Sequence, residues 1–175
     1  ETAIIYFIND GILAGKSPAT LQTYKFSLKV LKDYINSLFL PQEFNSLTEA
    51  VLRDFFIYGL KIRGWSKYTQ WTHHKNLSAY FNWSIKKGFI AISPLSNIPK
   101  PKLPSQSPKS FSEKEAITIL QVVSNMPTKY YFCKIRNKAV VATFLFTGLR
   151  KSELLNLQCD DVDLTNGFIQ VQHGK

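Results

Sequence analysis

Arg150 and Glu153 are the residues whose types and spacing most clearly suggest chemistry. They lie in the segment ATFLFTGLRKSELLNL, where an apolar run ends at Gly148 and charged side chains follow. A guanidinium on a rigid support can grip two nonbridging phosphate oxygens at once, which a flexible lysine does less well. Glu153 lies three residues further on the same helical face and can orient that arginine. An Arg-x-x-Glu pair alone is more often a surface ion pair, so both interpretations stay open at this point.

The basic charge of the chain is concentrated in its first part. The whole sequence carries 22 lysine and arginine residues against 12 acidic ones, a formal net charge of +10. Residues 1–109 hold 14 basic and 6 acidic side chains, a net charge of +8, whereas residues 110–175 have a net charge of +2. Cations that neutralise phosphates release condensed counterions, so a basic segment favours a polyanionic partner. Charge by itself is equally compatible with a protein that is merely basic.

A helix expected over residues 66–87 carries the most suggestive mixture of side chains. Its first turns combine cations, hydrogen-bonding groups and the flat aromatic ring of Trp71, which suits contact with phosphates and base edges in a major groove. The alternative is that Trp71 packs in a core and its polar neighbours are only solvated. A row of lysines on the helix expected over residues 17–38 is weaker evidence, because such rows are most often a solvated face. The residues that we expect to contact DNA are Lys16, Thr20, Lys25, Lys67, Thr69, Gln70, Trp71, His74, Lys75, Lys100 and Lys102.

The sequence predicts no metal site and no membrane segment. Cys133 and Cys159 are the only cysteines and lack CxxC spacing, so reduced thiols in an intracellular protein fit better than zinc ligands or a disulfide scaffold. His73 and His74 are adjacent, and neighbours on a helix point in different directions. No apolar run approaches the ~20 residues that span a bilayer.

The first part of the chain predicts four helices. Ser17 and Pro18 suit the start of one of them, because serine caps a helix and proline is tolerated at its first position. Ser66 caps another, which Gly88 ends. The four helices are expected over residues 3–13, 17–38, 48–61 and 66–87. Three- and four-residue steps predict two buried stripes, which comprise Leu21, Tyr24, Leu28, Leu31, Ile35 and Leu38 on the second helix and Leu77, Tyr80, Phe81 and Ile85 on the fourth.

A proline-rich linker separates this part from a second one. The stretch NIPKPKLPSQSPKS suits neither helix nor strand, so a boundary is expected near residues 99–110. Ser112 and Glu115 then predict a capping box and a helix to about residue 123. Residues 134–146 predict a helix so apolar that we expect it to be buried. A short helix follows in RKSELLNL, and Asn166-Gly167 predicts a hairpin turn before the strand FIQVQ.

The segment around Arg150 resembles the first catalytic block of the tyrosine recombinases, or phage integrases. In that family a TGLRxSEL-type segment carries the first catalytic arginine, and the turn of a following strand pair carries a catalytic lysine. Gly174-Lys175 stands where that lysine is expected. The front of the chain is similar to the helical core-binding domain of the family, and the resemblance covers nearly the whole chain. The matching residues of the block are Thr147, Gly148, Leu149, Arg150, Ser152, Glu153 and Leu154.

The resemblance implies a fold, a reaction and roles for residues. The fold is mainly α, with a four-helix SAM-like core-binding domain at 1–98, a linker at 99–110 and the front of an α+β catalytic domain with a short β-hairpin at 111–175. Such enzymes cut DNA through a 3′-phosphotyrosyl intermediate and use no metal or nucleotide cofactor. Arg150 neutralises charge on the phosphorane-like oxygens, Lys175 protonates the departing 5′-oxygen, and Glu153 supports them.

The sequence departs from the family pattern after the hairpin. The family continues with H-x-x-R, a further His or Trp and the nucleophilic tyrosine, whereas all eight tyrosines of this sequence precede Arg150. We therefore expect these 175 residues to be a fragment, with a complete core-binding domain and a truncated catalytic domain, that binds double-stranded DNA but is inactive alone and monomeric in solution. The resemblance further implies a parent enzyme that forms a homotetramer on a recombination site in the cytoplasm of a prokaryotic cell, encoded by that cell or by a phage or mobile element.

Three other interpretations remain at this stage. The chain can be a non-catalytic DNA-binding module, either a truncated relative or a competitor of a recombinase. A helical protein-interaction module is a second alternative, but it gives the +8 charge of residues 1–109 no role. A type IB topoisomerase shares the chemistry, and the integrase-like helical part argues against it.

Overall fold

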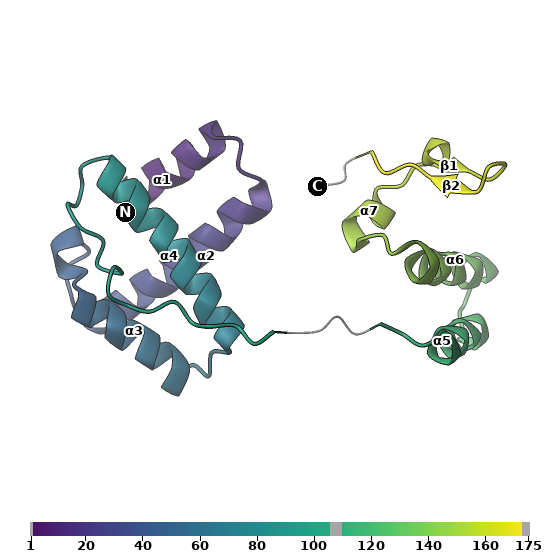
Figure 1. Ribbon diagram of the computed structural model, residues 1–175, viewed down its shortest axis with the longest axis horizontal. Helices are drawn as coiled ribbons and strands as arrows, with labels where there is room; N and C mark the ends of the chain where they lie inside the picture. Colours follow the sequence, from purple (N-terminus) through teal and green to yellow (C-terminus); the bar gives the residue numbers. More distant parts are fainter. Residues whose placement is uncertain (1, 106–109, 173–175) are drawn as a thin grey trace. The chain divides into compact units, whose positions relative to one another are not determined.

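The computed structural model describes residues 2–105 and 110–172, which form two compact units (Figure 1). The units divide between Gln106 and Ser107, inside the stretch expected to be a linker. Helices dominate both units, and the second also contains a small antiparallel sheet, so the predicted fold class is confirmed.

The first unit consists of four α-helices and one short 3-10 turn. Helix α2 packs against α1 and α4, and α3 packs against α4 (Figure 1). The four helices match the expected ranges to within two residues at either end. Their bounds are α1 Thr2–Leu13, α2 Pro18–Ser37, α3 Glu49–Lys61 and α4 Lys67–Lys86, with the 3-10 turn η1 at Phe44–Ser46.

Short polar side chains start these helices as the sequence predicts. The hydroxyl oxygen of Ser17 accepts a hydrogen bond from the backbone N–H of Thr20 at the start of α2. Ser66 does the same for Thr69 at the start of α4. Each cap satisfies a backbone donor that the helix cannot pair internally, which stabilises it by about 1 kcal/mol. Gly88 follows α4 with φ +74°, a backbone conformation that glycine adopts without the steric cost of a Cβ atom.

The core of the first unit is built from the predicted stripes of α2 and α4, with two exceptions. Leu38 and Ile85 are exposed, so their predicted burial is wrong. Both lie at helix ends, where the stripe has already turned away from the neighbouring helices. Aromatic rings fill much of the interior, and Phe55 is fully buried. The predicted stripe residues that are buried are Leu21, Tyr24, Leu28, Leu31, Ile35, Leu77, Tyr80 and Phe81.

A buried polar network joins α2 to α4. The amide nitrogen of Asn76 donates to the backbone carbonyl of Thr23 at 3.1 Å and to the hydroxyl oxygen of Ser27 at 2.9 Å. The same hydroxyl lies 3.1 Å from Nδ1 of His73, whose ring packs 4.3 Å from that of Trp65. Because Asn76 supplies a donor to Ser27, the serine proton is free to point at Nδ1, and this arrangement suits a neutral histidine. Burial accordingly lowers the pKa of His73 below its ordinary value of 6.5.

The second unit places two helices and a short helix ahead of a hairpin. Helix α5 packs against α6, and α6 packs against α7 (Figure 1). The hairpin pairs Val162 with Ile169 and Asp163 with Phe168. The bounds are α5 Glu113–Asn125, α6 Tyr131–Thr147, α7 Lys151–Leu155, the 3-10 turn η2 Cys159–Asp161, β1 Val162–Asp163 and β2 Phe168–Ile169.

Local signals in the second unit are confirmed, but two expectations are wrong. The capping box of Ser112 and Glu115 is present, and Gly167 has the positive φ of the predicted turn. Strand β2 has two residues rather than five. Helix α6 was expected to be buried, yet none of its residues is buried in the described part of the chain, and Phe146 is 75% exposed. The helix neighbours α5 and α7 in this unit, and these two cover only part of its apolar surface.

The buried histidine makes the stability of the first unit depend on pH. Since the pKa of His73 is lower in the folded state, the unfolded state binds more protons as the pH falls below about 6.5. The free energy of unfolding should therefore decrease between pH 7 and pH 5. Tryptophan fluorescence during urea unfolding measures this, because Trp65, Trp71 and Trp83 all lie in the first unit.

His73→Asn provides the control for this prediction. An asparagine oxygen can replace Nδ1 as acceptor for Ser27, and it does not titrate in this range. The variant should lose less stability than the wild type over the same pH interval. An equal loss in both proteins would show that His73 is not the group responsible.

Candidate functional site

Glu153 holds Arg150 at two points. One carboxylate oxygen accepts from the backbone N–H of Arg150 at 2.8 Å, and the other accepts from its guanidinium Nη1 at 2.7 Å. The side chain of Glu153 is 12% exposed and that of Arg150 is 69% exposed. The hydrogen bond from the Arg150 backbone, followed by that from its side chain, holds the pKa of Glu153 below its usual range. The pair therefore presents a guanidinium to solvent while one edge of it is fixed.

The turn before Arg150 depends on Gly148. This residue caps α6 with φ +66°, and its N–H donates to the carbonyl of Phe144 at 3.3 Å. A residue with a Cβ atom is strained in this left-handed conformation by about 1 kcal/mol or more. The hydroxyl oxygen of Thr147 accepts from the N–H of Leu149 at 3.3 Å, which further defines the turn. The sequence Thr-Gly-Leu-Arg thus ends one helix and places Arg150 as the N-cap of α7.

The lysine predicted to act with this arginine, Lys175, lies outside the described residues, as does Gly174. The described part of the chain ends at Gln172, three residues before Lys175. The segment that leads there is anchored by Asp161, a buried carboxylate that the sequence analysis did not single out. Asp160 and Asp163 in the same segment CDDVDL are also acidic, so no sequence pattern distinguishes Asp161 from them.

The ring of Trp71 contacts two of the lysines that are predicted to bind DNA. The Nζ atom of Lys100 lies 4.4 Å from the centre of the Trp71 ring, and that of Lys75 lies 5.4 Å from it. Both distances fall within the range of a cation–π interaction. Lys75 belongs to α4, whereas Lys100 lies beyond it in the chain. Trp71 is half-buried, so one ring both packs against the unit and holds two cations at the surface.

The segment that carries Lys100 is attached to the first unit. Leu95 and Ile98 are buried in its core, and the amide of Asn97 donates to a carboxylate oxygen of Glu49 at 2.8 Å. Nε2 of His74 lies 2.9 Å from the backbone carbonyl of Ile98. These contacts fix the chain up to the residues just before Lys100 and so define where that lysine emerges.

His74 has a structural place rather than an exposed one. Its side chain is 8% exposed and packs beside the ring of Phe56. A ring that is buried and bonded to a backbone carbonyl is not available to a duplex, so we leave His74 out of the interface proposed below. The pattern of residues along the helix could not predict the burial of His74, because its hydrogen bond is to Ile98, 24 positions later in the chain.

The remaining predicted DNA-contacting residues do not all gather around Trp71. His73 and Asn76 of α4 contact Ser27 and Thr23 of α2 where the two helices cross (Figure 1). The hydroxyls of Thr20 and Thr69 lie within hydrogen-bonding distance of the capping serines. The predicted cations of this group are all exposed, namely Lys16, Lys25, Lys67 and Lys102.

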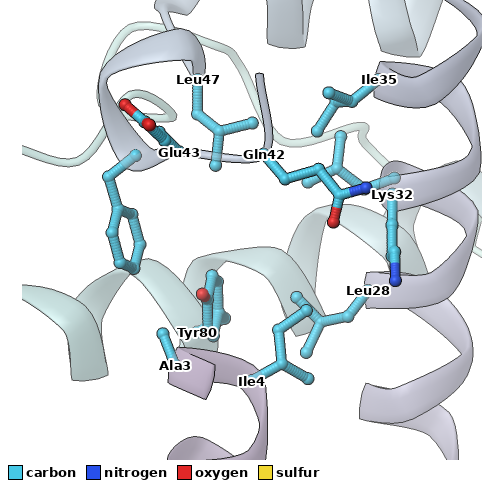
Figure 2. A pocket seen from close by; sticks show the side chains of 11 residues that line it. Ala3, Ile4, Leu28, Lys32, Ile35, Gln42, Glu43, Leu47 and Tyr80 are labelled. Carbon is cyan, nitrogen blue, oxygen red and sulfur yellow. The ribbon is translucent and has the colours of Figure 1, made fainter. Parts of the chain in front are cut away.

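An apolar pocket of about 80 Å³ lies elsewhere in the first unit. Figure 2 shows Ile4 of α1, Leu28 of α2, Leu47 and the ring of Tyr80 of α4 around it. Burial raises the pKa of Tyr80 to about 12, so its hydroxyl stays protonated at neutral pH. None of the predicted site residues lines this pocket, which is a gap at the edge of the core rather than part of the candidate site.

The described residues contain no group of three or more histidine, cysteine, aspartate or glutamate side chains placed to bind a metal ion. Within residues 2–105 and 110–172, no helix has the length and apolar character needed to cross a bilayer.

Comparison with known proteins places both units in one family. Residues 4–101 match the phage integrase SAM-like domain, and residues 109–175 match the phage integrase family. The tyrosine recombinase XerA of Pyrococcus furiosus is 29% identical over 163 residues, which are 93% of this chain and 49% of the relative. The tyrosine recombinase XerC of Thermodesulfovibrio yellowstonii is 29% identical over 158 residues, which are 90% of this chain and 49% of the relative.

The crystal structure of a XerA recombinase is similar at 23% sequence identity with a TM-score of 0.45, over 98% of this chain and 55% of that one. The chain spans about half the length of the curated relatives it matches. The SAM-like match alone covers more than half of the 175 residues. The chain belongs to the phage integrase family, whose curated relatives here are tyrosine recombinases.

Proposed function

We propose that this chain is the DNA-binding part and the first catalytic part of a site-specific tyrosine recombinase. The observation that carries the proposal is the pair Arg150–Glu153, fixed by two hydrogen bonds in a segment that matches the family. An exposed guanidinium with one edge held by a carboxylate keeps further N–H donors for phosphate oxygens.

The reaction we propose needs no metal or nucleotide. A tyrosine oxygen forms a bond to the phosphorus of the scissile phosphodiester, and the bond from phosphorus to the 5′-oxygen breaks. Arg150 stabilises the negative charge on the nonbridging oxygens, and Lys175 gives its proton to the departing 5′-oxygen. The 3′-phosphotyrosyl bond is then attacked by the 5′-hydroxyl of another strand, which releases the tyrosine. The phosphotyrosyl bond conserves the energy of the phosphodiester, so no external energy source is required.

In this proposal the DNA interface is basic and partly pre-ordered. Its cations are Lys16, Lys25, Lys67, Lys75, Lys100 and Lys102, and its other members are Thr20, Thr69, Gln70 and Trp71. The cation–π contacts of Trp71 support the part of this interface that Lys75 and Lys100 form, since they reduce the side-chain freedom that these two lysines lose on binding a phosphate. The parent enzyme acts as a homotetramer on its recombination site, whereas residues 1–175 alone are monomeric and contain no tyrosine after Arg150.

The first prediction is a steep salt dependence of DNA binding. Six lysines that each neutralise a phosphate give a slope of about −5 in a plot of log binding constant against log salt concentration. The affinity of residues 1–175 for duplex DNA should then fall about 10³-fold between 50 and 200 mM salt, as measured by fluorescence anisotropy. A flat isotherm series over this range would contradict the proposed interface.

The second prediction concerns Trp71. Trp71→Leu keeps an apolar side chain but removes the surface on which two lysines rest, so the DNA affinity should fall about five-fold, equivalent to about 1 kcal/mol. Lys100→Ala should reduce the salt slope by about one. Lys114→Ala, an exposed lysine of α5 outside the proposed interface, is the matched control and should leave both quantities unchanged. An effect of Lys114→Ala equal to that of Lys100→Ala would indicate a non-specific charge effect.

The third prediction concerns catalysis by the full-length protein that contains this chain. Arg150→Ala should reduce covalent DNA–protein adducts by at least 10²-fold, because it removes charge stabilisation in the transition state, while DNA affinity changes little. Residues 1–175 alone should form no adduct. Denaturing gel electrophoresis after reaction with a nicked substrate measures the adduct. Loss of binding to the same degree as loss of adduct would assign Arg150 a structural or positioning role instead.

A further inference from the structure

The backbone just before Lys100 is fixed by a buried histidine. Leu95 and Ile98 are buried in the first unit, and the N–H of Ile98 donates to the carbonyl of Leu95 at 3.0 Å. The carbonyl oxygen of Ile98 lies 2.9 Å from Nε2 of His74 on α4. A carbonyl oxygen only accepts, so Nε2 carries the proton and donates it. His74 therefore holds the last buried residue before Lys100.

Few backbone torsions separate this carbonyl from Lys100. The residue between them is Pro99, whose ring locks its φ near about −65°. A residue before a proline is restricted to extended conformations, which limits the ψ of Ile98. Pro101 restricts Lys100 in the same way. The position of the Ile98 carbonyl therefore largely determines that of the Lys100 backbone.

The side chain of Lys100 returns to the same helix. Trp71 precedes His74 by three residues, a spacing that puts both on one side of α4. The ring of Trp71 lies 4.4 Å from Nζ of Lys100 and 5.4 Å from Nζ of Lys75. Two ammonium groups repel each other, so their approach to one ring depends on how both stems are held. Helix α4 thus holds this segment at two points, at a backbone carbonyl through His74 and at an ammonium through Trp71.

We propose that His74 is a positioning residue for the contact of Lys100 with a DNA phosphate. Its bond to Ile98 exists before DNA binds, so Lys100 has less conformational freedom to lose when it reaches the phosphate. His74 is 8% exposed and acts through the backbone rather than by touching the duplex. This inference rests on the proposed function, because it takes the partner of Lys100 to be DNA.

Two substitutions of His74 separate its hydrogen bond from its packing. Leucine has a similar volume but no donor, so His74→Leu leaves the carbonyl of Ile98 without this partner. Glutamine offers an amide NH₂ at a comparable reach, so His74→Gln keeps a donor. The matched control is His73→Leu, which removes the adjacent buried histidine. His73 contacts Ser27 of α2 instead of the segment before Lys100.

The placement of Lys100 is measured first by NMR without DNA. Protons over an aromatic ring are shifted upfield by its ring current. The ε-methylene signal of Lys100 should therefore lie upfield of its position in Trp71→Leu. His74→Leu should lose most of this upfield shift, whereas His74→Gln and His73→Leu should retain it.

Fluorescence anisotropy with duplex DNA at about 0.1 M salt then measures the effect on binding by residues 1–175. Lys100→Ala should lower the affinity by about five- to ten-fold, the loss of one phosphate contact. His74→Leu should lower it by about three- to five-fold, because one long side chain must be ordered on binding. His74→Gln and His73→Leu should stay within about 1.5-fold of the wild type. In the Lys100→Ala background, His74→Leu should have no further effect, since no ammonium is left to position.

Pro99→Gly tests the same inference without removing a buried group, because Pro99 is exposed. It frees the torsions between Ile98 and Lys100, so the affinity should fall about three-fold. This loss should also disappear in the Lys100→Ala background. The variant decides the question if His74→Leu does not fold.

Three results would overturn the inference. They are wild-type affinity in His74→Leu, an equal loss in His73→Leu, and a loss that persists in full in the Lys100→Ala background. The last two would mean general distortion of the unit. Failure of the proposed function gives a different result, in which the wild type shows the upfield shift of Lys100 but no binding to duplex DNA. That result would overturn both the proposed function and the role of His74 in it.

Discussion

The two-point contact between Glu153 and Arg150 is the interaction on which the proposed active site depends. A mobile arginine loses side-chain entropy when it grips a phosphate, and this loss weakens transition-state stabilisation. Glu153 removes part of that freedom in advance, because its carboxylate bonds both the backbone N–H and the guanidinium. The first of these bonds also starts α7, so the helix and the arginine are set by the same group. The left-handed turn at Gly148 brings the chain into this arrangement directly from α6.

In the first unit an aromatic ring, rather than a carboxylate, restricts the side-chain freedom of two lysines. A carboxylate beside Lys75 or Lys100 would orient the ammonium but reduce the positive potential of the proposed DNA interface. The ring of Trp71 attracts both cations through its quadrupole and leaves their charge in place. Asp10 shows the contrasting case, since its carboxylate accepts from the indole N–H of Trp83 and pairs with Lys87 at 2.8 Å, which joins α1 to α4. The lysine with a structural role and the lysines proposed to bind DNA thus differ in their partners.

Features that depend on neighbours in the sequence could be predicted, whereas features that depend on distant contacts could not. The caps at Ser17 and Ser66, the turn at Gly148 and the contact of Arg150 with Glu153 all follow from residues within four positions. The burial of His74 depends on Ile98, and the exposure of Phe146 on α6 depends on which elements cover that helix. An apolar sequence therefore does not by itself predict that a helix is buried. Burial requires other elements to cover the helix, and the sequence pattern describes only the helix itself.

Asp161 illustrates why buried polar contacts between distant residues cannot be predicted from sequence patterns. Its neighbours Asp160 and Asp163 have the same side chain, and the spacing of the three has no helical or strand period that singles one out. Only the fold distinguishes them: Asp160 is exposed, Asp163 accepts from Thr165 and Asn166 within the turn, and Asp161 bonds residues nine and eleven positions later. A two-residue ladder cannot by itself direct the chain that follows Ile169. The buried carboxylate supplies that direction, because its two oxygens fix separate segments at once and each bond restricts the other.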